Sequence, residues 1–224
     1  MKKTYIKFII TILIIPFLLF AGIFFFNDRS YLAISFLIVF FSLIPVWLHF
    51  ERKSTTTREL IILAVLTAIS VTGRYIFAAI PGFKPVTAIT TISGIYFGPE
   101  AGFLVGSLSA LVSNIFFMQG PWTPFQMFSW GLIGFISGLL QKTLLDNKVA
   151  LSFFGIFAGT LYSFLMDIWT VLSIDGTFNL NRYLAALISA IPFTLTYAIS
   201  NVIFLLVLTK PIGRRLERIK KKYL

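Results

Sequence analysis

Long apolar runs dominate this chain and restrict what it can fold into. A run of about 20 residues with few charges is long enough to cross the roughly 30 Å hydrocarbon core of a bilayer as a helix. Hydrophobic residues make up 58% of the 224 residues and charged residues only 12%, whereas a soluble globular protein carries about 25% charged residues. The sequence therefore predicts an all-α integral membrane protein.

The apolar runs and the polar breaks between them predict eight spans. We place these at residues 6–26, 31–50, 60–80, 86–97, 101–118, 124–145, 149–172 and 183–209. The first run is followed by bulky residues, so we expect a retained helix rather than a cleaved signal peptide. The polar stretch 51–59 divides the chain into an N-terminal transmembrane hairpin with its linker, residues 1–57, and a six-helix membrane domain, residues 58–224.

The run 86–97 is the weakest of these spans. Its 12 residues rise only about 18 Å as a helix, which is less than the thickness of the hydrocarbon core. Neighbouring loops that enter the membrane against protein would make up the difference.

Basic residues are distributed unevenly between the two sides of these spans. Of the 19 lysines and arginines, 15 fall on the side that holds both termini, and only Arg29, Lys84 and Arg182 fall on the other. Because Lys and Arg concentrate in cytoplasmic loops, we expect a multi-pass protein of the cell membrane with both termini cytoplasmic. The turn at 119–123 then faces outward. The net charge of +11 reflects this orientation rather than nucleic-acid binding.

The composition argues against several chemistries. The chain has no cysteine and one histidine, His49, so we expect no disulfide and no metal site. It has no phosphate-binding loop for ATP hydrolysis, and only Asp167 among its acids lies well inside a span. We therefore expect no catalytic residues and no cofactor. A membrane enzyme or accessory subunit acting on a lipid, and a structural membrane protein without a ligand, remain as alternatives.

Arg74 and Asp167 are the two charges that lie well inside the predicted spans of the main domain. A charge in the hydrocarbon core costs roughly 2.5–3.5 kcal/mol on insertion scales and so has a structural or functional reason to be there. Both lie five or six residues from the outer end of their helix, about 7–9 Å deep. They either pair with each other or contact a ligand.

The segment 114–130, NIFFMQGPWTPFQMFSW, interrupts the apolar pattern with aromatic residues and carboxamides. An interfacial aromatic belt explains Trp122, but it does not explain the amides on either side of the turn. Aromatic faces with a few convergent amides are typical of ligand pockets. The candidate binding residues are Asn114, Gln119, Trp122, Gln126 and Trp130, with Arg74, Asp167, Trp169, Tyr197 and Asn201 as further candidates from other helices.

Two helices carry small residues spaced by four, which allow another helix to approach closely. In 60–80 these are Ala64, Ala68 and Thr72, which either pack within the bundle or dock on a separate membrane partner. In 101–118 they are Gly102, Gly106 and Ala110, for which we expect packing inside the bundle.

Residues 58–224 resemble a substrate-binding S component of an energy-coupling factor (ECF) vitamin transporter. The resemblance rests on the six-helix unit with cytoplasmic termini, on Ala64-x-x-x-Ala68, and on two long runs. These are GIYFGPEAGFLVGSLSALVSN at 94–114 and QGPWTPFQMFSWGLIGFISGLL at 119–140. Residues 119–130 are most similar to predicted cobalamin-specific S components, which also carry an N-terminal hairpin.

The resemblance implies a mechanism and a set of partners. The chain would capture a vitamin at the outer face and deliver it inward with a transmembrane coupling protein and two ATPase subunits. Ala64 and Ala68 would match the face that docks on the coupling protein, and the loop 81–85 would match the lid over the vitamin. The vitamin is a substrate and not a cofactor. Cobalamin is the expected substrate, and riboflavin, pyridoxine or a queuosine-like modified base are the alternatives.

Overall fold

The computed structural model describes residues 57–223, and regular structure in that range is entirely helical. The helices are α3 (Thr57–Ile76), α4 (Val86–Phe97), α5 (Pro99–Phe117), α6 (Thr123–Leu139), α7 (Gln141–Asp146), α8 (Lys148–Asp175), α9 (Leu180–Ser189) and α10 (Ile191–Tyr223). The predicted hairpin at 6–26 and 31–50 lies outside the described residues. The prediction of an all-α main domain is thus confirmed for 57–223.

Within this range, α3, α5, α8 and α10 are long and apolar enough to cross a membrane. The expected total of eight spans, the hairpin boundary and the side on which the termini lie stay predictions.

Helix α4 is the buried centre of the bundle. Its bounds match the predicted 86–97, and every residue from Val86 to Ile95 is buried. Helices α3, α5, α6 and α10 all pack against it. A helix that is buried on all sides contacts protein rather than lipid. Because protein surrounds it, α4 does not need the length of a lipid-exposed span.

The backbones of α5 and α6 are in direct contact. A Cβ added to Gly102 would collide with the carbonyl oxygen of Gly134, and one added to Gly106 would lie 2.5 Å from the carbonyl carbon of Trp130. Ala110, the next residue in the row, is fully buried. The predicted role of this row in packing within the bundle is confirmed.

Two predicted helices are divided in the structure. The run 124–145 forms α6 and α7, with a turn at Leu140. The run 183–209 forms α9 and α10, which separate at Ala190 just before Pro192. Proline has no N–H to donate and disfavours helical geometry at the residue before it, so Pro192 is tolerated only in the first turn of a new helix. Hydropathy alone does not detect either break, because the apolar run continues through both.

Other helix ends differ by a few residues. Helix α3 ends at Ile76 and not at residue 80, because the chain turns there into the Pro81–Gly82 segment. Helix α8 continues to Asp175 and ends at Gly176, whose φ of 73° is left-handed, a conformation that glycine adopts without steric cost.

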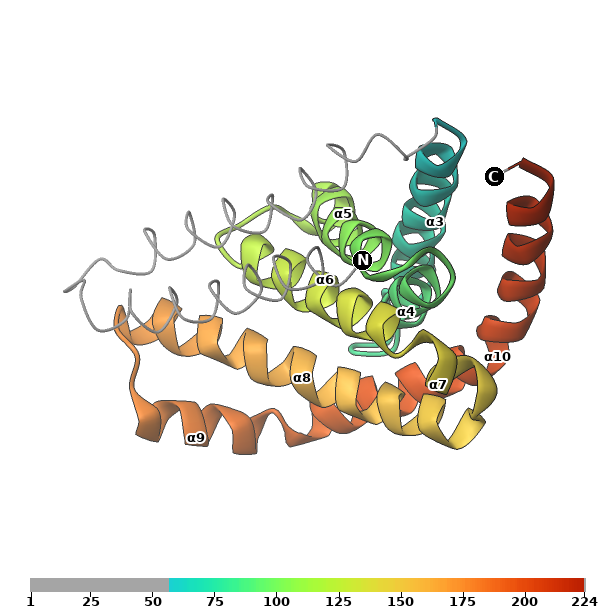
Figure 1. Ribbon diagram of the computed structural model, residues 1–224. Coiled ribbons are helices and arrows are strands. Elements are labelled where there is room, and N and C mark those ends of the chain that lie inside the picture. The colour runs from blue at the N-terminus through green and yellow to red at the C-terminus, as the bar shows by residue number, and fades with distance from the viewer. Residues whose placement is uncertain (1–56, 224) are drawn as a thin grey trace, which may run out of the picture.

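Helix α10 extends well beyond its predicted end, through Pro211 to Tyr223. Figure 1 shows it changing direction: the first part runs alongside α8, and the second part rises to the C-terminus, where it lines a groove together with α3. A proline inside a helix removes a hydrogen bond and kinks it. Beyond Pro211, Leu216 packs into a core with Leu63 and Leu66 of α3 and Ile92 of α4. The basic C-terminal stretch is therefore part of the bundle rather than a tail.

The contact between α5 and α6 predicts that a methyl group added at a glycine lowers the free energy of unfolding more inside this contact than outside it. Gly134→Ala places a Cβ against the backbone carbonyl of Gly102, so we expect it to lower the free energy of unfolding by about 1–3 kcal/mol. The matched control is Gly155→Ala in α8, whose Cβ would lie 3.1 Å from the nearest atom. There the gain of about 1 kcal/mol in helix propensity offsets the crowding. Thermal unfolding of the purified variants in detergent measures both, and equal losses would contradict this account of the contact.

Candidate functional site

Polar and aromatic side chains from six segments meet at one end of the bundle. The last turns of α3 and α5, the loop before α4 and the first turns of α6 supply the polar groups, and α8 and α10 supply two tyrosines. We call this set the amide–aromatic cluster. Its members are Arg74, Lys84, Ser113, Asn114, Thr123, Gln126, Trp130, Tyr162 and Tyr197.

Asn114 is the centre of the hydrogen bonds in this cluster. It is fully buried, and its Oδ1 accepts a bond of 2.8 Å from Nη1 of Arg74. Its Nδ2 donates to Thr123 Oγ1 and to Gln126 Oε1, both at 2.9 Å. The same Arg74 nitrogen also donates to Ser113 Oγ. Since the amide has two donor hydrogens and an acceptor oxygen, Asn114 ties α3, α5 and α6 together.

Aromatic rings continue the cluster toward α8 and α10. Gln126 Nε2 donates to the hydroxyl of Tyr162 over 3.3 Å. The ring of Tyr162 stacks on Trp130 with centroids 5.2 Å apart and planes 10° apart, and it meets Tyr197 edge-on at 5.1 Å. The three rings thus form a continuous apolar wall beside two amide side chains. Such a wall suits a planar ligand with polar edges.

Two cations face these rings. The guanidinium of Arg74 lies 4.6 Å from the ring centre of Phe117 and 5.3 Å from that of Trp130. The ammonium of Lys84 lies 5.2 Å from the ring centre of Tyr197, 5.6 Å from Trp130 and 5.7 Å from Tyr162. Cations at these distances are attracted by the negative ring faces. Burial, with a smaller contribution from the charge of Arg74, lowers the pKa of Lys84 to about 7.

The loop that carries Lys84 is fastened to α10. The backbone N–H of Lys84 donates to Ser200 Oγ over 2.9 Å, and the Ser200 hydroxyl lies 3.3 Å from the Lys84 carbonyl oxygen. Phe77 and Phe83 both contact the ring of Phe204, with centroids 5.1 and 5.0 Å away. Gly82 has a φ of 80°, and its missing side chain lets the loop approach Tyr197 and its neighbour Thr196. The expected packing of this loop against protein is what the structure shows.

The structure places the predicted binding residues in three groups. Arg74, Asn114, Gln126, Trp130 and Tyr197 belong to the cluster. Gln119 lies at its exposed rim, where its Oε1 accepts a hydrogen bond from Thr123 and its Nε2 donates to the Leu111 carbonyl. The remaining four, Trp122, Asp167, Trp169 and Asn201, lie outside the hydrogen bonds and ring contacts that define the cluster.

Those four residues have other surroundings. Trp122 precedes α6 and covers Gly120, while Trp169 contacts the ring of Phe125 at 5.6 Å. Asn201 is buried and donates to the Gly155 carbonyl, which joins α10 to α8. Asp167 does not pair with Arg74, which bonds instead to Ser113 and Asn114. Its buried Oδ2 has no hydrogen-bond partner among the described residues. The prediction of similar depths for Arg74 and Asp167 therefore does not imply that the two side chains are in contact.

Sequence reasoning missed Lys84, Ser113, Thr123 and Tyr162. Lys84 was counted only as a loop charge, although its position in the predicted lid was a usable signal. Tyr162 carries a hydroxyl in the middle of an apolar run, which was a second signal. Ser113 and Thr123 flank the amide-rich segment but are small, and no pattern distinguishes them from packing residues.

The small-residue row of α3 faces away from the described bundle. Ala64, Ala68 and Thr72 are all exposed, and so are Val65 and Ile69 on the same side. Packing within the bundle, one of the two alternatives for this row, is therefore not what the described residues show. Docking on a partner stays a prediction.

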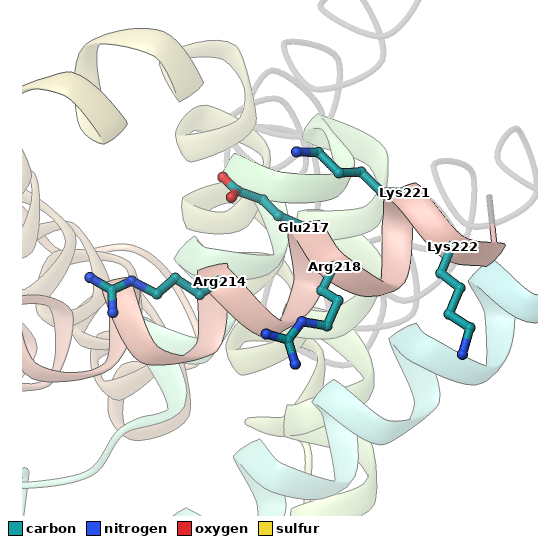
Figure 2. Close-up of a pocket in the computed structure, with 5 residues that line it drawn as sticks. All are labelled: Arg214, Glu217, Arg218, Lys221 and Lys222. Atoms are coloured by element: carbon teal, nitrogen blue, oxygen red, sulfur yellow. The ribbon is translucent and has the colours of Figure 1, made fainter.

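A surface hollow lies away from the cluster, near the C-terminus. It has a volume of 630 Å³ and is lined by Arg214, Glu217, Arg218, Lys221 and Lys222. Figure 2 shows that these side chains do not converge, because Arg218 and Lys222 extend to one side of α10 and Glu217 and Lys221 to the other. Diverging charges on a helix surface do not make a binding site comparable to the cluster.

The lack of an ion pair between Arg74 and Asp167 is testable by a double-mutant cycle. We expect Arg74→Met to lower the free energy of unfolding by about 1–3 kcal/mol, because it leaves a buried acceptor of Asn114 unbonded. Asp167→Asn should change it by less than about 0.5 kcal/mol, and the double variant should be additive within about 0.5 kcal/mol. Thermal unfolding in detergent provides the measurement. A coupling above about 1 kcal/mol would show that the two charges interact directly.

Comparison with known proteins shows which family the sequence matches. A sequence model of the family described as "ECF-type riboflavin transporter, S component" matches residues 54–218, which is most of the chain. Two curated relatives, both named UPF0397 protein, come from Aliivibrio fischeri strains MJ11 and ATCC 700601 / ES114. Each is 29% identical over 118 residues, covering 45% of this chain and 64% of the relative. No solved structure matches the chain.

The comparisons agree with the S-component resemblance and give no support to cobalamin as the substrate. The family description names riboflavin, one of the alternatives considered from the sequence. The match extends over all the helices that carry the amide–aromatic cluster. The chain belongs to the family of S components of ECF-type riboflavin transporters.

Proposed function

We propose that this chain is the substrate-binding membrane subunit of an ECF-type transporter and that the amide–aromatic cluster binds its vitamin. The observation that carries the proposal is the position of the cluster. Amides, cations and three rings converge where α3, α5 and α6 end or begin, beside a loop that covers them. A capture site at a helix end, under a loop, suits a subunit that receives a small molecule from one side of a membrane.

A flavin ring is the ligand that these groups suit best. Its planar tricyclic system would lie against Trp130 and Tyr162, and its carbonyl and imide edge would exchange hydrogen bonds with Asn114 and Gln126. Cobalamin is much larger than a flavin. Its rim of amides would require more hydrogen-bonding partners than the side chains of the cluster provide. Riboflavin-type ligands therefore replace cobalamin as the preferred class, in agreement with the family description.

Ligand entry requires the loop 77–85 to move. The ammonium of Lys84 lies among Trp130, Tyr162 and Tyr197, at the place where a ring would bind. Apart from the contacts of this lysine, the loop is held to α10 by the Ser200 hydroxyl, by the Phe204 ring and by the approach of Gly82 to Thr196. We infer that the loop acts as a lid by separating from α10.

The exposed row on α3 is the surface proposed to dock on the coupling protein. Ala64 and Ala68 present no side chain beyond Cβ and leave the backbone of α3 open to a partner helix, as small residues do in membrane helix pairs. ATP hydrolysis then belongs to the partner ATPase subunits.

Ligand binding tests the first part of the proposal. Full-length protein purified in detergent should carry a vitamin detectable by mass spectrometry, or bind added riboflavin with quenching of flavin fluorescence. Gln126→Met keeps the side-chain volume and removes one hydrogen-bonding amide, so we expect about tenfold weaker binding. Gln141→Met, at an exposed position in α7, is the control and should bind normally.

Two results would count against this function. Protein that carries no vitamin and binds neither riboflavin, pyridoxine nor cobalamin is not a capture subunit. Binding of cobalamin in preference to riboflavin would restore the substrate first expected from the sequence.

Docking tests the second part. We expect Ala64→Trp combined with Ala68→Trp to abolish co-purification with a coupling protein, because two indoles would hold the partner helix away from α3. Ligand binding should survive, since neither position touches the cluster. Ala185→Trp on the exposed face of α9 is the control. An intact complex in the double variant would exclude this face as the docking surface.

A further inference from the structure

An apolar groove lies between α3 and the C-terminal part of α10, and we call it the α3–α10 groove. Its volume is 390 Å³, and every described residue that lines it is aliphatic except Arg215. The α3 wall includes Ile61, Val65 and Ile69, which are 44–58% exposed. A hollow of 300 Å³ adjoins the groove, shares three isoleucines with it and adds Arg58 to the lining. The groove is therefore an exposed aliphatic surface with arginines beside it.

The two walls of the groove are fixed relative to each other. Leu216 of α10 is buried and packs with Leu63 and Leu66 of α3. Four residues later, Lys220 donates from its Nζ to the Tyr96 carbonyl over 2.7 Å. The C-terminal part of α10 is thus held against the bundle, and the groove is a fixed feature of the fold.

One edge of the groove is basic. Residues 212–223 of α10 contain six lysines and arginines and one acid, Glu217. Arg215, Arg218 and Lys222 are spaced by three and four residues, so they lie on the same side of the helix. Figure 2 shows Arg218 and Lys222 extending to one side of α10 and Glu217 to the other. The positive charges therefore lie along the same edge as Arg215, and the acid lies away from it.

We propose that the α3–α10 groove binds an anionic phospholipid from the leaflet on the predicted cytoplasmic side, with an acyl chain against the aliphatic walls and the phosphate at Arg58 and Arg215. Guanidinium groups bind phosphate through paired N–H donors, and basic pockets between membrane helices on the cytoplasmic side bind anionic headgroups. Among the described residues, no acid lines the groove or the hollow beside it. The lining would therefore attract a phosphate. This inference goes beyond vitamin capture and does not rest on it.

A helix of a partner protein is the alternative occupant, and the side chains of the groove disfavour it. Helices in membranes approach closely where small residues line the contact. Ala64 and Ala68, the small residues of α3, line neither the groove nor the adjoining hollow. Branched side chains line the groove instead, and a flexible acyl chain can follow their surface. A lipid in the groove and a partner on the small-residue row would thus occupy neighbouring sides of α3.

Two lipids that differ only in their headgroups test the inference on the full-length protein. Phosphatidylglycerol is anionic and phosphatidylcholine is zwitterionic, and both are used with the same acyl chains. Native mass spectrometry of the detergent-purified protein, titrated with each lipid, gives the two dissociation constants. We expect phosphatidylglycerol to bind about tenfold more tightly, because basic residues near the surface attract anionic headgroups. An excess of glycerol 3-phosphate should not displace it, because that molecule has the phosphate without the acyl chains.

Variants assign the binding to the groove. Arg58→Gln combined with Arg215→Gln should reduce the preference for phosphatidylglycerol to less than about threefold. Val65→Trp, at a half-exposed position in the α3 wall, should weaken the binding of both lipids because the indole fills the groove. Arg214→Gln combined with Lys221→Gln removes two charges from the same part of α10 outside the groove lining. It is the matched control and should leave the preference unchanged. Size-exclusion chromatography checks that each variant stays folded and monodisperse.

The same measurements define the results that would contradict the inference. Equal binding of the two lipids would mean that the basic residues act only in setting the orientation of the chain. A preference that persists without the two groove arginines, or that is lost equally in the control variant, would place the headgroup elsewhere. Unchanged binding in Val65→Trp would exclude the groove as the site of the acyl chain. Displacement by glycerol 3-phosphate would identify a site for free phosphate and not for a lipid.

Discussion

The close approach of α5 and α6 determines most of what the bundle can do. Glycines at Gly102, Gly106 and Gly134 let the two backbones touch, and that contact fixes how far one helix slides along the other. The register places the end of α5 beside the beginning of α6, so that Asn114 reaches both Thr123 and Gln126. Arg74 of α3 then completes the hydrogen bonds of the same amide. The polar cluster is thus a consequence of packing between small residues that carry no polar side chain.

The burial of α4 has a similar organising effect. Because other helices surround it, α4 can be short, and the loop before it can fold inward onto α10. The sequence placed Lys84 in a surface loop. Because the loop folds inward, its ammonium lies over the faces of three rings. A longer α4 would have carried the lysine away from the aromatic wall.

Much of the helical framework could be predicted from the sequence, because apolar runs and their polar breaks report directly on helices in a membrane. The bounds of α4 and the packing role of the Gly102 row followed from the chain alone. The break before Pro192 was missed because hydropathy is continuous across it. The choice of neighbouring helices was harder to predict. The sequence predicts similar depths for Arg74 and Asp167, but depth along a helix says nothing about which helices are adjacent. Lys84 and Tyr162 were missed because their importance comes only from the fold of the loop and the position of α8.

Helix α10 joins the two ends of the molecule. Ser200 holds the loop over the amide–aromatic cluster, and Lys220, about 30 Å farther along the helix, donates from its Nζ to the carbonyl of Tyr96 at the far end of α4. Pro211 lies inside the helix between them, and a proline in a helix interior favours a kink. The first half of α10 is also joined to α8, because Asn201 donates to the Gly155 carbonyl. One continuous helix therefore links the fastening of the loop over the cluster to a contact with the far end of α4.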